Sequence, residues 1–263
     1  MVRDTYYRDH WVQIEPERLD RYEQMFRWSP AYARLLEPAQ IEHGQVVADF
    51  DCGPGAMAVE LAKQVGAGGH VHAMDVNAEF VARARKKAAA AGFSDRMTAH
   101  HLTGATIPLP DAALDRIVTK NALVYVDDPL ATFCEFRRVV KPGGKVHAVD
   151  SDWATAIVEP VPLEQWRAFM QAACHAFRNP LIGRQMFGIA KQAGFSSVEV
   201  RVVTNPDTEG RYLNLVHNLA GYAREAGTLG EGDIQAVVHR VERAVQDGTF
   251  LGVNPQFMVT ATV

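Results

Sequence analysis

Val46-Val47-Ala48-Asp49-Phe50-Asp51-Cys52-Gly53-Pro54-Gly55 gives the clearest indication of the fold in this sequence. A short apolar run, typical of a buried strand, breaks into a glycine turn, and a helical segment at 56–65 follows directly. Asp75 ends the next apolar run, roughly 20 residues further along the chain. Together these features predict a nucleoside-cofactor site at the carboxyl edge of a parallel sheet. There the glycines let the backbone approach the ligand, and the second-strand carboxylate holds both ribose hydroxyls.

Strand and helix patterns alternate from residue 45 to residue 150, which predicts a doubly wound, mostly parallel α/β sheet with helices on both faces. Lys141-Pro142-Gly143-Gly144 is expected to end a helix and to start the fifth strand, because proline stops the helix and the glycines permit a sharp reversal. The expected strands are 46–50, 71–75, 97–102, 114–119 and 145–150, and the expected helices are 56–65, 78–91 and 129–140.

Helical patterns flank this alternating region. Two helices are expected to start at Pro16 and Pro30, before any strand. The expected elements after the fifth strand are helices at 162–178 and 184–193, a sixth strand at 198–203, amphipathic helices around 212–222 and 234–245, and a last strand at 257–263. We therefore expect one domain over residues 1–263, with a helical lid at 1–40, a cofactor-binding core at 41–150, and the rest of the sheet with helical substrate-side insertions at 151–263.

Composition and charge exclude several classes of protein. The net charge is −4, and no basic cluster is longer than Arg85-Lys86-Lys87, so a nucleic acid is not expected as a partner. Three scattered cysteines argue against a disulfide framework or a zinc cluster and favour a reducing cytoplasm. Charged residues stand within the first ten positions, where a signal peptide needs an apolar run, and no stretch approaches the roughly 18 apolar residues of a membrane span. We expect a cytoplasmic protein without a membrane span, and the sequence leaves a homodimer open.

Two nucleoside cofactors compete for the glycine turn. Residues 53–58 fit the dinucleotide fingerprint with alanine in the last position, so an NAD(P)-dependent oxidoreductase stays open. Asp49, however, would repel the pyrophosphate of such a cofactor. A cationic ligand would be attracted by the same carboxylate, and S-adenosylmethionine carries an ammonium and a sulfonium but no phosphate.

At this point the chain resembles the class I S-adenosylmethionine-dependent methyltransferases, in particular the small-molecule branch that includes the ubiquinone and menaquinone C-methyltransferases. The resemblance covers residues 40–150 and rests on five stretches in the expected order. They are Ala48–Gly55, Asp75-Val76-Asn77, Leu102–Asp111 with Leu114-Asp115, Asn121–Pro129 and Arg138–Gly144.

The resemblance implies S-adenosylmethionine as cofactor, S-adenosylhomocysteine as product and a small-molecule methyl acceptor. By the same resemblance, the methionine part would contact Asp49, Asp51, Cys52, Gly53 and Gly55, the ribose Asp75 with Val76 and Asn77, and the adenine edge Thr103, Gly104 and Ala105. Asn121 and Tyr125 would lie near the reacting methyl.

Two residues depart from the family pattern. Asp51 stands where the loop usually has its first glycine, and Thr103 stands where an acidic residue usually faces the adenine amino group. Asp51 either pairs with the ammonium or obstructs the site. A protein that keeps the fold and binds the cofactor without transferring methyl therefore remains an alternative.

Methyl transfer to a small, aromatic or apolar metabolite is an in-line displacement that positioning and desolvation can drive, so no catalytic motif is required. Candidate catalytic residues are Tyr125, Asp152 and His217, although an Asp that caps a helix and a packed or half-exposed His are the commoner situations. No metal is expected, because Lys120 and Asn121 stand where a metal-dependent enzyme of this type would place a carboxylate. The expected substrate pocket is Tyr7, His10, Trp11, Asp152, Trp153 and His217.

Overall fold

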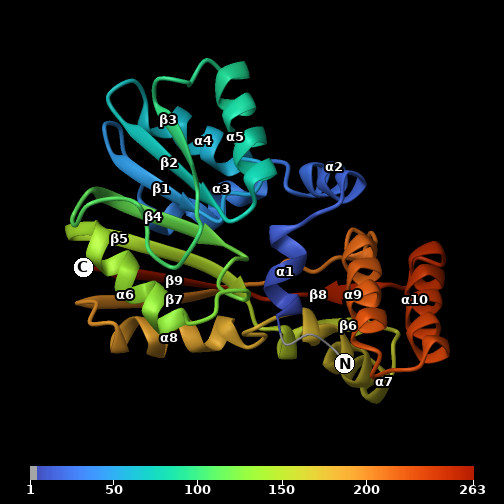
Figure 1. Ribbon diagram of the computed structural model, residues 1–263. Helices are drawn as coiled ribbons and strands as arrows, with labels where there is room; N and C mark the ends of the chain where they lie inside the picture. Colours follow the sequence, from blue (N-terminus) through green and yellow to red (C-terminus); the bar gives the residue numbers. More distant parts are fainter. Residues whose placement is uncertain (1–4) are drawn as a thin grey trace.

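The computed structural model describes residues 5–263, so the charged start of the chain at Met1–Asp4 lies outside the described residues. Seven strands form one sheet in the order β3-β2-β1-β4-β5-β9-β7 (Figure 1). Neighbours from β3 to β5 run parallel, whereas β9 runs antiparallel to both β5 and β7. The strands are β1 (Val46–Phe50), β2 (His70–Asp75), β3 (Met97–His101), β4 (Leu114–Lys120), β5 (Val140–Ser151), β7 (Ser197–Val203) and β9 (Gln256–Thr262).

This architecture confirms the predicted doubly wound, mostly parallel sheet with a returning last strand. The predicted strand at 145–150 is longer in the structure, because β5 begins at Val140 and includes the Pro142-Gly143-Gly144 turn. The pairing of β5 with β4 shifts register between Leu114 and Arg116, so the turn residues are accommodated in the strand by an irregularity.

Helices cover both faces of the sheet. One face packs Val47, Val71 and Val118 against α4 (Ala56–Val65) and α5 (Ala78–Ala90). The other face packs Ile117 and Val146 among residues of α6 (Pro129–Val139) and α8 (Ile182–Gln192). The sheet is thus buried between two helical layers, and its carboxyl edge is the place left for a ligand.

Three N-terminal helices lie beside the carboxyl edge of the sheet: α1 (Tyr6–Val12), α2 (Pro16–Met25) and α3 (Pro30–Leu36), the last followed by η1 (Glu37–Ala39). The helices predicted to start at Pro16 and Pro30 are present. In contrast, no helix was predicted before Pro16, and the structure places Tyr7, His10 and Trp11 on α1. This helix is short, and it packs its Tyr6 ring against His175 and Tyr222 from the far end of the chain.

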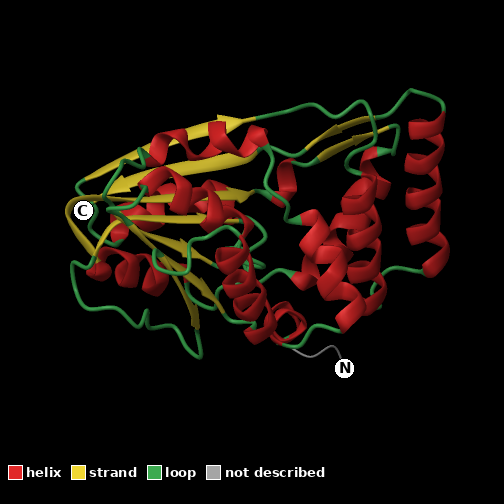
Figure 2. Ribbon diagram, turned by 90° about the horizontal axis from the view of Figure 1, so that it is seen from above, coloured by secondary structure: helices red, strands yellow, loops and turns green. Residues whose placement is uncertain are grey.

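The helices other than α8 and the short strands inserted between β5 and β9, on either side of β7 in the sequence, form a group beyond the ends of the sheet strands (Figure 2). Its buried Phe169, Leu219 and Val237 belong to the same core as the sheet. The predicted helical segment 162–178 is shorter in the structure, and a small two-stranded sheet, β6 with β8, was not expected. The elements are η2 (Trp153–Thr155), β6 (Ile157–Glu159), α7 (Leu163–Ala173), η3 (Cys174–Ala176), α9 (Leu213–Ala226), α10 (Glu231–Gln246) and β8 (Leu251–Val253).

Among the helices of residues 5–263, none combines the length and the apolar character needed to cross a membrane.

Candidate functional site

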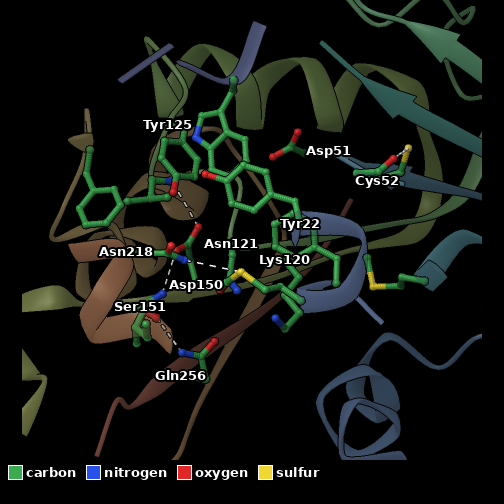
Figure 3. Close-up of a pocket in the computed structure, with 18 of the residues that line it drawn as sticks. Tyr22, Asp51, Cys52, Lys120, Asn121, Tyr125, Asp150, Ser151, Asn218 and Gln256 are labelled. Carbon is green, nitrogen blue, oxygen red and sulfur yellow. Dashed lines mark hydrogen bonds between the residues drawn. The ribbon is translucent and has the colours of Figure 1, made fainter. Parts of the chain in front are cut away.

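A cavity of about 290 Å³ lies at the carboxyl edge of the sheet, between the strand ends and the helices α2 and α9 (Figure 3). The glycine loop contributes Asp51, Cys52 and Gly53 to its wall. The strand ends and the segments after them contribute Asp75, Lys120, Asn121, Asp150 and Ser151. The aromatic side chains of the wall are Trp11, Tyr22, Phe26, Trp28, Tyr32, Phe80, Tyr125, Trp153, Phe177 and Tyr222. A mostly apolar cavity with a few converging polar groups is the usual form of a small-molecule site.

The glycine loop has three residues in the left-handed region. Asp51 has φ 64°, Gly53 has φ 52° and Gly55 has φ 85°. A β-carbon at Gly55 would come within 2.7 Å of the Ala84 backbone, so this glycine lets α4 and α5 pack closely. Asp51 adopts the conformation that a glycine would supply, and aspartate is among the residues that tolerate it best.

Asp75 is fixed by the backbone at the end of β2. Its carboxylate accepts hydrogen bonds from the Gly53 amide at 2.7 Å and from the Asn77 amide at 2.8 Å. Burial and the neighbouring Asp75 carboxylate hold the pKa of Asp51 well above its ordinary value. Burial also raises the pKa of Asp75, while its two backbone hydrogen bonds oppose that shift. The two acids therefore share one anionic corner of the cavity, which suits a ligand with a positive charge and hydroxyl donors.

Asp49 occupies a different place from the one the sequence analysis gives it. It is fully buried in β1 and is not part of the cavity wall. Burial, and then the charge of Asp75, raise its pKa to about 8. Neither of its carboxyl oxygens makes a hydrogen bond of normal geometry within the described residues. Asp49 thus lies within the sheet and outside the cavity wall.

The residues expected around the ribose and adenine are only partly in the wall. Val76, Asn77, Thr103, Gly104 and Ala105 all lie outside it. Asn77 instead caps α5 by accepting a hydrogen bond from the Phe80 amide at 3.0 Å, and its amide donates to the Trp11 carbonyl at 2.8 Å. It therefore ties the N-terminal helices to the end of β2. The segment at 103–105 is exposed.

Asn121 and Tyr125 both line the cavity, as expected. Asn121 sits directly after β4 with φ 57°, another left-handed residue at the same edge, and its backbone amide donates to the Val149 carbonyl at 2.8 Å. The Tyr125 ring packs edge-on against Trp11 with 5.1 Å between the ring centres. Burial raises the pKa of the Tyr125 phenol well above its usual value, so the group stays protonated and can donate a hydrogen bond.

The residues expected in the substrate pocket divide into two groups. Trp11 and Trp153 line the cavity, and Trp153 stacks on Phe177 with 4.8 Å between the ring centres. Tyr7 and His10 do not line it. The Tyr7 hydroxyl donates to Asp127, and the buried His10 ring packs edge-on against Tyr222 of α9 with 5.5 Å between the ring centres, so both residues anchor α1.

Two of the candidate bases have other partners. Asp152 is buried, accepts a hydrogen bond from the Ala154 amide and forms an ion pair with Arg184. His217 on α9 is partly exposed, and its Nε2 atom lies 3.0 Å from Glu242. Neither side chain lines the cavity. The common situations, a capping aspartate and a surface histidine, describe these two residues.

Lys120 and Asp150 were not predicted from the sequence as site residues. Lys120 ends β4, Asp150 lies near the end of β5, and both line the cavity. Burial lowers the pKa of Lys120 to about 8, and burial raises the pKa of Asp150 to about 7. The signal available in the sequence is their position, since charged residues that close two adjacent parallel strands meet at the ligand edge.

Within residues 5–263, no group of three or more His, Cys, Asp or Glu side chains is arranged to hold a metal ion.

Residues 47–144 match a protein-family model described as "Methyltransferase domain". The matched region contains the glycine loop, Asp75, Lys120, Asn121 and Tyr125, which together form most of the cofactor edge of the sheet.

Two curated relatives extend this similarity. An uncharacterized 37.1 kDa protein of a Streptomyces fradiae transposon is 31% identical over 200 residues, which are 74% of this chain and 56% of the relative. A demethylmenaquinone methyltransferase of Anoxybacillus flavithermus is 28% identical over 122 residues, which are 46% of this chain and 51% of the relative. The chain thus spans about half the length of these curated relatives.

Among solved structures, the Haemonchus contortus phosphoethanolamine N-methyltransferase 2 in complex with S-adenosyl-L-methionine is 17% identical, with a TM-score of 0.65. The superposition covers 100% of this chain and 60% of that one. At this level of identity the similarity establishes the fold.

Proposed function

We propose, from the premise that residues 47–144 of this chain form a class I S-adenosylmethionine-dependent methyltransferase domain, that the protein transfers a methyl group to a small, aromatic or otherwise apolar metabolite. The cofactor supplies an electrophilic methyl group on a sulfonium when it is bound.

The observation that carries the proposal is the facing pair of carboxyl groups, Asp51 and Asp75, at the ends of β1 and β2. Asp51 would hold the ammonium of the methionine part, and Asp75 would accept hydrogen bonds from the ribose hydroxyls. The backbone around Gly53 leaves room, because a β-carbon at this glycine would have only an ordinary contact at 3.5 Å with Phe26. These groups fit a cationic nucleoside without phosphate.

An NAD(P)-dependent oxidoreductase is not supported. Asp51 and Asp75 would meet a pyrophosphate with repulsion at the glycine turn. The family match and the methyltransferase similarity point in the same direction.

The chemistry that we propose for the protein rests on positioning and on exclusion of water. Aromatic side chains from α1, α2 and α9 close the cavity, so an acceptor held there loses most of its contact with solvent. Holding an acceptor at near-attack distance can supply about 7–11 kcal/mol of the barrier. Asp150 can take a proton from an acidic acceptor, since its pKa of about 7 lies near the working pH.

Three unpaired cysteines, Cys52, Cys134 and Cys174, fit the reducing cytoplasm that the sequence analysis expects, and that location is part of the proposal.

The direct test is a transfer assay. Incubation with S-adenosylmethionine and fractionated metabolite extracts is expected to give a product heavier than its precursor by the mass of one methylene, with one S-adenosylhomocysteine formed for each product. Formation of a new compound with no S-adenosylhomocysteine would favour the alternative of a cofactor-binding protein that does not transfer methyl.

A further inference from the structure

The cavity contains one basic side chain among its described lining residues, Lys120. No carboxylate of the described residues lies within 4.0 Å of its ammonium group. The Nζ atom instead lies 4.6 Å from the centre of the Tyr32 ring. Figure 3 shows Lys120 at the carboxyl edge of the sheet with its neighbours Asn121 and Asp150.

Asp150 is the acid whose charge acts on Lys120, and its oxygens already have other partners. One oxygen accepts from the Ser151 amide at 2.8 Å and the other from the Val124 amide at 3.2 Å. Burial lowers the pKa of Lys120 and Asp150 opposes that shift, which leaves the pKa at about 8. The lysine is therefore mostly protonated at neutral pH and has no direct ion-pair partner in the described residues.

Polar groups with unused hydrogen-bonding capacity lie on the same side. Lys120 pairs with Val149 in the sheet, and Ser151 follows two residues later on the same face. The Ser151 hydroxyl oxygen accepts from Asn254 at 3.2 Å and from Gln256 at 2.6 Å, and this leaves its proton free to donate. Elsewhere in the cavity wall, the indole N–H groups of Trp11 and Trp153 also lack a partner in the described residues.

Lys120 lies on a different part of the cavity wall from the acidic pair Asp51 and Asp75, and the third acid of the wall, Asp150, lies on the neighbouring β5. Asp51 and Asp75 belong to β1 and β2 and their loops, whereas Lys120, Ser151 and Gln256 belong to β4, β5 and β9. A partly desolvated ammonium without a counter-ion is costly, and an anion brought by a ligand removes that cost. The aromatic wall around this end suits an apolar body attached to the anion.

We propose that the methyl acceptor carries a carboxylate or a similar anionic oxygen group, which Lys120 binds together with the Ser151 hydroxyl, while the apolar part of the acceptor packs against the aromatic wall. This inference rests on the proposed function, because it places the cationic cofactor at the Asp51 side and the anionic acceptor at the Lys120 side.

The first test uses the unaltered protein. Binding of 2-naphthoate and of its neutral isostere 2-naphthamide is measured by fluorescence titration in the presence of saturating S-adenosylhomocysteine. The expected result is a preference of at least tenfold for 2-naphthoate. Equal binding of the two probes, or preference for the amide, would overturn the inference even though S-adenosylhomocysteine binds. Failure of S-adenosylhomocysteine itself to bind would instead count against the proposed function.

The second test uses variants. Lys120→Met is expected to bring the ratio of the two probe affinities close to one, and Lys120→Arg is expected to keep the preference. The matched control is Lys145→Met, since Lys145 begins the regular pairing of β5 at the opposite edge of the sheet and contacts the Gln40 side chain there. This control should leave the ratio unchanged.

The anion could also belong to the cofactor, whose methionine part has a carboxylate. Titration of Lys120→Met with S-adenosylhomocysteine and with 5′-deoxy-5′-methylthioadenosine, which lacks the amino acid, separates the two sources. Unchanged affinity for both compounds is expected. A tenfold loss for S-adenosylhomocysteine alone would assign Lys120 to the cofactor and overturn the inference.

Discussion

Among the individual residues, Asp51 combines two energetically unfavourable features. It holds a left-handed backbone conformation with φ 64°, and its carboxyl group faces another buried acid. Strained backbone and perturbed pKa values gather at functional sites because the surrounding structure imposes both. Asp51, which stands where the loop usually has its first glycine, therefore adds an ionisable group to the site.

The raised pKa of Asp51 predicts a pH dependence. The group is protonated in the free protein on the acid side of that pKa, and it must ionise to pair with an ammonium. Affinity for S-adenosylhomocysteine should therefore increase with pH by up to about tenfold per unit below that pKa, the limit for one linked proton. Asp51→Asn should flatten the profile of calorimetric affinities from acid to neutral pH. A variant with the slope of the parent would assign the titration to another group.

Asp75 is expected to be the strongest single cofactor contact. Asp75→Ala removes an acceptor for the ribose hydroxyls and frees two backbone amides, so affinity for S-adenosylhomocysteine should decrease by about 1–3 kcal/mol. Calorimetry measures this change directly. An affinity equal to that of the parent would reject the ribose assignment.

Gly55 offers a test of the loop geometry. Gly55→Ala should destabilise the fold by about 1–3 kcal/mol, because the residue has φ 85° and a β-carbon there would lie 2.7 Å from the Ala84 backbone. Gly104→Ala is the matched control, since nothing lies within 4 Å of its added β-carbon and its φ is not positive. Denaturant unfolding compares the two, and equal stabilities would contradict the packing argument.

At the scale of the element, the helix α1 explains what sequence patterns can and cannot reveal. The strands and helices of residues 45–150 repeat a local pattern of apolar runs, caps and glycines, so they could be predicted. The helix α1 depends on His175 and Tyr222, which are more than 160 positions away, and no local pattern marks those contacts. Tertiary packing decides such short helices.

Asn77 has two roles. Its side-chain oxygen caps α5, and its side-chain amide holds α1 against the end of β2. Asn77→Ser keeps an oxygen that can cap α5 but loses the amide that donates to the Trp11 carbonyl. We expect global stability to change by less than about 1 kcal/mol, while backbone amides of α1 exchange faster with solvent and S-adenosylhomocysteine binds more weakly. Hydrogen exchange read by mass spectrometry reports on α1, and unchanged protection there would show that the Asn77 contact does not hold the helix.

At the scale of the whole molecule, one sheet edge brings together side chains from four strands and from both ends of the chain. The sequence analysis identified the glycine loop and Asp75 from the order of strands and loops, and Asn121 and Tyr125 from the resemblance to a methyltransferase family. It did not identify Lys120 and Asp150, whose roles depend on adjacent strands in the sheet, and it assigned Asp152 and His217 to a cavity they do not line. Which side chains meet at the ends of neighbouring strands depends on the register in which those strands pair, and the sequence alone does not give that register.

The anionic corner of the cavity should select a cationic nucleoside over a dinucleotide. Calorimetric titration of the protein with S-adenosylhomocysteine and, in parallel, with NAD measures this selection. We expect saturable binding of S-adenosylhomocysteine and no measurable binding of NAD. Binding of NAD without binding of S-adenosylhomocysteine would contradict this expectation.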